Sequence, residues 1–137
     1  MNSLTNETRT AVSAVVDLPH WVSICAVDDI VPGTGVAALV DGEQVAIIRS
    51  PQGDALFGLS NFDPYSKAFV IARGIVGDKN GVLKIASPIY KQSFDLRTGV
   101  CLEEPAVALS VYKVRVADGR VEVFSESFTP TQLSDAE

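Results

Sequence analysis

Short segments that alternate apolar and polar residues, separated by turn residues, run along the middle of the chain. They span residues 21–27, 36–40, 43–49, 112–117 and 120–124. Two pairs of these segments are joined by Asp41-Gly42 and by Asp118-Gly119. Aspartate followed by glycine between two apolar segments is typical of a two-residue hairpin turn, because both turn positions need positive φ. The pattern therefore predicts two antiparallel hairpins.

Helical periodicity is weak along the whole chain, so we expect one helical turn near residues 64–68 or at 28–30 and no long helix. The glycine-rich segment 73–81 is interpreted as a hairpin loop. Short strands with frequent turns are typical of an all-β antiparallel sandwich or barrel. A single domain is predicted over residues 18–125. The tails, 1–17 and 126–137, are rich in small and polar residues and are predicted to be mobile, with Phe128 as a possible anchor.

The composition is that of one acidic globular domain. The chain has 137 residues, a formal net charge of −6 and a pI near 4.7. Nucleic acids and anionic membranes select clustered Lys and Arg, so the charge argues against both as partners. No apolar run approaches the roughly eighteen residues of a membrane span, and the N-terminus does not have the pattern of a signal peptide. A cytoplasmic location is therefore expected.

Counting ligands argues against a metal centre built from thiolates and imidazoles. The chain contains one histidine, His20, and two cysteines, Cys25 and Cys101. An iron–sulfur site with two Cys and two His ligands needs a second histidine, and a zinc site needs Cys or His at short spacing. In a reducing cytoplasm the two cysteines are interpreted as small buried hydrophobic residues, with one disulfide as the alternative.

Candidate catalytic residues are scarce. A Ser-His-Asp or Cys-His arrangement has to use His20, which stands at the start of the first predicted strand and is interpreted as a strand-edge residue. The segment 33–35, Gly-Thr-Gly, precedes a strand, whereas a dinucleotide-binding glycine motif follows one and opens a helix. No catalytic site is expected in this chain.

Two segments resemble the metal-binding loops of Rieske iron–sulfur domains in which every metal ligand has been replaced. They are residues 61–65, Asn-Phe-Asp-Pro-Tyr, and residues 87–96, Ser-Pro-Ile-Tyr-Lys-Gln-Ser-Phe-Asp-Leu. Rieske loops supply two thiolates and two imidazoles, as Cys-x-His and then Cys-x-x-His. The four corresponding positions here are Asp63, Tyr65, Ser87 and Tyr90. A proline still follows the first position of each pair.

The wider resemblance is to the small subunit of assimilatory NADH-dependent nitrite reductase, the NirD type, a cluster-less Rieske-like family. It covers residues from about 20 to 124. It includes three segments with few or no ligand positions, at residues 72–78, 86–92 and 94–102. This resemblance implies an antiparallel β-sandwich with a small inserted subdomain at residues 60–98, which lacks the iron–sulfur cluster.

The same resemblance implies a function in nitrate assimilation. The chain would be a non-catalytic small subunit without a cofactor of its own. Its partner would be a large nitrite reductase subunit that carries FAD, iron–sulfur and sirohaem groups and reduces nitrite to ammonium. The alternative is a Rieske-fold electron-transfer or small-ligand-binding module that acts with another oxidoreductase.

Two roles are open for the replaced ligand positions. Tyr65 and Tyr90, with Lys91 and Arg73, are expected to contact the large subunit, because tyrosine offers a large ring with a polar end. Alternatively, the two tyrosines fill the volume that a cluster would occupy. In either case the serine and phenol hydroxyls can bond one another or Asp63, and so fasten the loops in place of the cluster.

Overall fold

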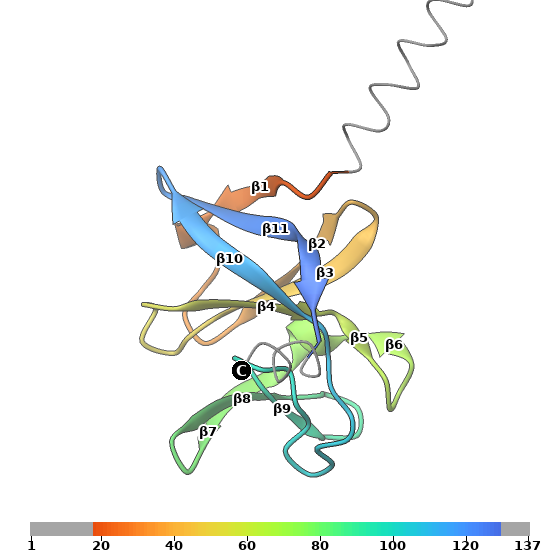
Figure 1. Ribbon diagram of the computed structural model, residues 1–137. Coiled ribbons are helices and arrows are strands. Elements are labelled where there is room, and N and C mark those ends of the chain that lie inside the picture. Colours follow the sequence, from red (N-terminus) through yellow and green to blue (C-terminus); the bar gives the residue numbers. More distant parts are fainter. Residues whose placement is uncertain (1–17, 130–137) are drawn as a thin grey trace, which may run out of the picture.

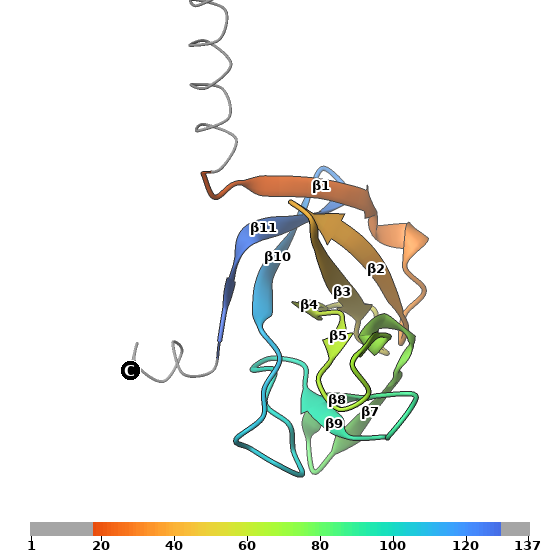
Figure 2. The same cartoon turned by 90° about the vertical axis from the view of Figure 1, so that its right-hand side faces the viewer.

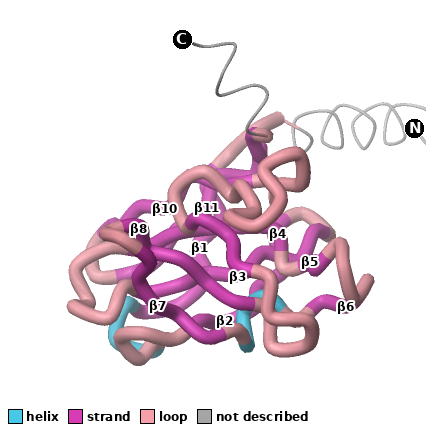
Figure 3. The backbone as a smooth tube through the Cα atoms, turned by 90° about the horizontal axis from the view of Figure 1, so that it is seen from below, coloured by secondary structure: helices cyan, strands magenta, loops and turns pink. Residues whose placement is uncertain are grey.

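The computed structural model describes residues 18–129, and this range consists almost entirely of strands and turns (Figure 3). The strands are β1 (Trp21–Ala26), β2 (Gly35–Val40), β3 (Glu43–Arg49), β4 (Leu56–Ser60), β5 (Phe62–Asp63), β6 (Ala68–Phe69), β7 (Ile75–Lys79), β8 (Val82–Ala86), β9 (Ser93–Asp95), β10 (Val111–Ala117) and β11 (Arg120–Phe128). Two three-residue 3₁₀ turns, η1 (Val27–Asp29) and η2 (Ile71–Arg73), are the helical elements of this range. The prediction of an all-β fold is confirmed.

Six strands form the main antiparallel sheet, in the order β1-β11-β10-β4-β3-β2. The β2–β3 and β10–β11 hairpins, orange and blue in Figure 1, turn at the two predicted Asp-Gly pairs. Asp41 and Gly42 have φ values of 50° and 86°, and Asp118 and Gly119 have 52° and 76°. Both hairpin predictions are confirmed. Positive φ at both turn positions gives the turn a twist that matches the right-handed twist of the flanking strands.

The remaining strands form an insertion between β4 and β10. It contains a two-stranded sheet, β5-β6, and a three-stranded sheet, β7-β8-β9, which lie below the main sheet in Figure 2. The chain leaves the main sheet after Ser60 and returns to it at Val111, so the insertion runs beyond the expected end at residue 98.

The segment 73–81 is a strand followed by a tight turn, and its interpretation as one loop was wrong. Residues 75–79 form β7, and the turn is confined to Asn80 and Gly81, with φ values of 55° and 86°. Gly74 is needed for space, since a Cβ there would stand 2.4 Å from the carbonyl oxygen of Ala86. The absence of a side chain lets η2 pass directly beside the end of β8.

Strand β3 is buried on both faces and separates two hydrophobic clusters. Val45 and Ile47 pack in a cluster with Val121 and Val123 of β11. The alternate residues, Ala46 and Ile48, pack toward the insertion in a second cluster. That cluster includes Leu59, Ile71, Ile85, Phe94, Leu96 and Cys101. Full burial of one such side chain contributes about 1.5–3 kcal/mol, so this second cluster fixes the insertion against the main sheet.

Strand β11 continues past the expected domain boundary at residue 125. It ends at Phe128, which packs against the second cluster, between the main sheet and the insertion. Residues 126–128 therefore belong to the folded domain. The expected N-terminal tail, 1–17, and residues 130–137 of the expected C-terminal tail lie outside the described residues.

Candidate functional site

Two loops of the insertion meet at the positions that correspond to Rieske metal ligands. The first loop, residues 61–67, follows β4, and the second loop, residues 87–92, joins β8 to β9. Ser87 Oγ donates a hydrogen bond to Asp63 Oδ2 over 2.6 Å. Both side chains are buried, with 1% and 0% exposed surface respectively. This bond, named the Asp63–Ser87 latch below, joins the two loops directly.

The first loop folds around the carboxylate of Asp63. Ser66 Oγ donates to Asp63 Oδ2 over 2.8 Å, and the backbone N–H of Tyr65 donates to Oδ1 over 2.9 Å. Burial by itself raises the pKa of Asp63, but the bonds from Ser87, from Ser66 and from the loop backbone lower it below its ordinary value. The carboxylate is therefore held in its charged form at neutral pH.

Asn61 attaches the first loop to the scaffold. Its Oδ1 accepts a hydrogen bond from the backbone N–H of Ala72 over 2.8 Å, and its Nδ2 donates to Gln44 Oε1 over 3.1 Å. The side chain is buried, with 2% exposed surface. It therefore connects β3, the first loop and η2, which fixes the position of the residues that follow it.

Tyr65 is directed into the protein. Its hydroxyl donates a hydrogen bond to Glu104 Oε1 over 2.7 Å and lies 3.5 Å from Cys101 Sγ. Its ring centroid is 6.3 Å from that of Phe94, and the ring packs against the buried cluster. The contact with Cys101, burial and the bond to Glu104 raise the pKa of Tyr65 well above its usual range. The phenol is therefore protonated at neutral pH.

Tyr90 is directed outward. It is 60% exposed, and the neighbouring Ile89 is 47% exposed. Lys91 lies next to it in the left-handed conformation, with φ of 65°. Its backbone N–H donates to the carbonyl oxygen of Ser87 over 3.1 Å, which closes the second loop. Arg73 is exposed at the end of η2, and among residues 18–129 neither Arg73 nor Lys91 takes part in an ion pair.

Three residues of this site were missed by sequence reasoning. Ser66 adds a second hydroxyl to Asp63, Glu104 accepts the Tyr65 bond, and Glu103 Oε1 accepts the backbone N–H of Ser93 over 2.7 Å. That last bond lowers the pKa of Glu103. Glu104 is 39 positions from Tyr65, and no spacing rule links the two.

The four positions do not fit a Rieske-type cluster. Such a cluster needs two thiolates and two imidazoles, whereas these positions offer a carboxylate, a hydroxyl and two phenols. The two positions that correspond to the thiolates are hydrogen-bonded to each other. Across residues 18–129, no three His, Cys, Asp or Glu side chains gather as a metal site would require.

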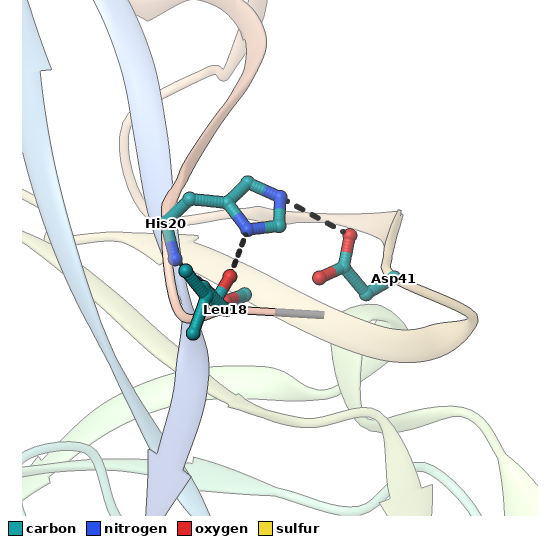
Figure 4. Close-up of polar contacts among 4 residues, drawn as sticks. Leu18, His20 and Asp41 are labelled. Carbon is teal, nitrogen blue, oxygen red and sulfur yellow. Dashed lines mark hydrogen bonds and ion pairs between the residues drawn. The ribbon is translucent and has the colours of Figure 1, made fainter. Parts of the chain in front are cut away.

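His20 lies at the start of β1, beside the β2–β3 turn, and belongs to neither of these loops (Figure 4). Its Nδ1 is 2.7 Å from the carbonyl oxygen of Leu18, and its Nε2 is 3.4 Å from Asp41 Oδ1. Ser125 Oγ accepts a bond from the backbone N–H of His20 and not from the ring. Within residues 18–129 the imidazole thus has an acid beside it, and no hydroxyl or thiol bonds the ring. It links β1 to the β2–β3 turn.

Comparison with known proteins identifies the family. Residues 20–124 match the family described as the Rieske-like [2Fe-2S] domain. The chain is also 45% identical over 106 residues to the nitrite reductase (NADH) small subunit of Salmonella typhimurium, which covers 77% of this chain and 98% of that protein. The chain belongs to the NADH nitrite reductase small-subunit family. The family resemblance and the Rieske-like fold are confirmed.

Two further relatives extend the comparison of this NirD-type chain. The NMR structure of the Escherichia coli protein NirD superposes with a TM-score of 0.73 at 42% identity, covering 78% of this chain and 97% of that one. The nitrite reductase [NAD(P)H] large subunit of Klebsiella oxytoca is 36% identical over 101 residues, which are 74% of this chain and 10% of that protein. A segment similar to the small subunits thus occurs in a large-subunit polypeptide. Within residues 18–129, no helix is long and apolar enough to span a membrane.

Proposed function

We propose that this chain is the non-catalytic small subunit of an NADH-dependent nitrite reductase and that it acts in the cytoplasm by binding and supporting the large subunit. The likeness to the Salmonella small subunit over 98% of its length supports this role. The Klebsiella large subunit supports it independently, because one polypeptide there contains a similar segment. A domain that occurs both separately and within a partner is expected to work in contact with that partner.

The observation that carries the non-catalytic part of this proposal is the Asp63–Ser87 latch. It joins the two positions at which a Rieske protein would hold iron through thiolates, so the second loop is fastened without a redox group. Electron transfer from NADH to nitrite would then belong to the large subunit, with FAD, iron–sulfur and sirohaem groups expected there. The small subunit would contribute a shaped and rigid contact surface.

We place that contact surface on the second loop. Tyr90 and Ile89 expose apolar side chains, and Lys91 beside them and Arg73 at the end of η2 carry positive charge. Aromatic side chains and arginine are enriched at protein interfaces, where they bury a large area per residue. Tyr65, whose hydroxyl is bonded to Glu104, would support the loops from inside and would contribute little direct contact.

Co-purification tests the proposal. The tagged full chain, expressed with a large subunit that contains flavin and sirohaem, is expected to retain that subunit through affinity and size-exclusion steps. The purified chain alone is expected to show no visible iron–sulfur bands and no reduction of nitrite. Iron–sulfur absorbance after anaerobic purification, or nitrite reduction by the chain alone, would overturn the non-catalytic role.

Matched variants test the contact surface separately. Tyr90→Ala and Lys91→Glu are each expected to weaken the association about fivefold or more, because each changes a central interface side chain. Lys67→Glu makes the same charge change on the first loop, at another exposed residue with positive φ, and is expected to leave the association unchanged. If the complex forms equally well with all three variants, the surface lies elsewhere even though the family role stands.

A further inference from the structure

The main sheet opens between β4 and β10, on a face that carries none of the four replaced ligand positions. The two strands pair at only two positions, Val111 with Leu59 and Tyr112 with Gly58. Beyond these pairs β10 continues to Ala117 and β4 extends back to Leu56, but the ladder between them does not continue. Figure 1 shows β10 and the end of β11 meeting β4 above the three-stranded sheet. A pocket of about 310 Å³ lies at this opening.

The walls of the pocket are mostly apolar. Phe57 of β4, Val111 of β10, Leu96 after β9 and Phe128 of β11 contribute to them. Phe128 reaches this position because the register of β11 against β10 shifts between Tyr112 and Val114, which bends the strand. The match to the family model ends at residue 124, four residues before Phe128.

The charged residues that line the pocket are positive, whereas the chain as a whole has a negative net charge. Arg97 and Lys113 line it, and among residues 18–129 no Asp or Glu does. Lys113 Nζ stands over the rings of Phe128 and Phe124, at 5.2 and 5.9 Å from their centroids, and within residues 18–129 neither cation takes part in an ion pair. On a chain with a net charge of −6, two uncompensated cations beside an apolar cavity favour an anion with an apolar body.

We propose that this pocket binds a small amphipathic organic anion, whose apolar body lies against Phe57, Leu96 and Phe128 and whose acidic head contacts Arg97 and Lys113. The volume, about 310 Å³, is at the lower end of the range for small-molecule pockets, roughly 300–1,000 Å³. It is suited to a medium-chain carboxylate or an arylcarboxylate. The proposal is independent of the proposed subunit role.

Octanoate is the probe, with octan-1-ol as the neutral control and octylammonium as the cationic one. Each is titrated into the ¹⁵N-labelled full chain and followed by amide chemical shifts. We expect octanoate to shift the amides of β4, β10 and residues 96–97, and to bind roughly fivefold more tightly than octan-1-ol, because its carboxylate adds solvent-exposed charge contacts with Arg97 and Lys113. Octylammonium is expected to bind more weakly than either. Equal affinity for the three probes would overturn the proposal.

Variants separate the acidic head from the apolar body. Arg97→Gln and Lys113→Gln are each expected to weaken octanoate binding roughly threefold or more without changing octan-1-ol binding. Lys67→Gln, at an exposed lysine that does not line the pocket, is expected to change neither. Octanoate affinity that is the same in all three variants would contradict the assignment. Binding that occurs only after deletion of residues 130–137 would also overturn it, because the pocket would then belong to the chain's own C-terminal segment.

Discussion

The first and second loops correspond to the two metal-binding loops of a Rieske domain, yet they use the same residue type in opposite ways. Tyr65 in the first loop turns inward and bonds Glu104, while Tyr90 in the second loop is 60% exposed. The difference lies in what stands opposite each tyrosine. The segment 101–104 brings Glu104 and Cys101 to the hydroxyl of Tyr65, and Phe94 lies beside its ring. Within residues 18–129 Tyr90 makes no side-chain hydrogen bond.

This difference divides the two roles that the sequence left open. Tyr65 is partly buried, packs against the hydrophobic cluster and bonds Glu104, which favours the filler hypothesis for this residue. Tyr90 is available to a partner, as the interface hypothesis expects, and that part stays a prediction. Two equivalent substitutions in a retained framework can therefore serve different ends, because each side chain adapts to its own neighbours.

Removal of the Asp63 carboxylate, the hydrogen-bond acceptor in the first loop, should have the largest effect on stability. Asp63→Ala leaves the hydroxyls of Ser87 and Ser66 and the N–H of Tyr65 without their partner in a buried site. We expect the free energy of unfolding to fall by about 2–4 kcal/mol. Urea denaturation measures this loss, and Asp28→Ala, at an exposed acid of η1, serves as the control that should change stability by less than about 0.5 kcal/mol. Similar costs for the two variants would show that the latch does not stabilise the fold.

The charge of Asp63 should make the free energy of unfolding depend on pH, with a smaller effect than that of Asp63→Ala. The folded-state pKa of Asp63 lies below its ordinary value. The carboxylate therefore stabilises the fold fully above its unfolded pKa of about 3.9, and this contribution is lost as the pH falls through the folded pKa. Asp63→Asn should cost about 1–2 kcal/mol near pH 7, and the gap to wild type should narrow below about pH 4. A gap that stays constant between pH 7 and pH 3 would refute this assignment.

Loss of the Tyr65 hydroxyl should lower the stability of the fold more than loss of the Tyr90 hydroxyl. Tyr65→Phe loses the bond to Glu104 and should lower the free energy of unfolding by about 0.5–1.5 kcal/mol. Tyr90→Phe removes an exposed hydroxyl and should leave the stability within experimental error. Thermal and urea denaturation of both variants provide the measurement. Equal losses would mean that the inward and outward orientations do not persist in solution.

Truncation of the exposed ring should have the smallest effect on stability. Tyr90→Ala is expected to change the free energy of unfolding by less than about 0.5 kcal/mol, since the ring is largely solvated. Its expected effect is on association with the large subunit. A stability loss above about 1 kcal/mol would show instead that Tyr90 packs within this chain.

Local turn chemistry made the hairpins predictable. The two Asp-Gly turns require positive φ, and few residue pairs meet that demand. The burial of single strand residues was less predictable. Val116 is an apolar residue that alternates with Arg115 and Ala117 along β10, yet it is 52% exposed, because it lies next to the hairpin end, where little of the sheet remains to cover it.

The candidate site was predictable where the loop framework was retained. The four replaced positions and a hydroxyl bond to Asp63 were both expected from the sequence, and Ser87 supplies that bond. The partner of Tyr65 was not predictable, because Glu104 comes from a turn whose path depends on tertiary packing. The C-terminal boundary was set three residues too early, at residue 125 instead of 128, although Phe128 was expected as a possible anchor. Its anchoring partner is a cluster assembled from distant segments, which the sequence does not reveal.

The Asp63–Ser87 latch also determines when the two loops can acquire their final shape. An acid and an alcohol form their bond as soon as the chain folds, whereas loops that close around a cluster must wait for iron and sulfide to be delivered. The closure of these loops is therefore expected not to depend on iron supply, nor on the damage that oxygen causes to exposed clusters. We expect such a chain to reach its folded state during iron limitation, independently of the large subunit proposed as its partner.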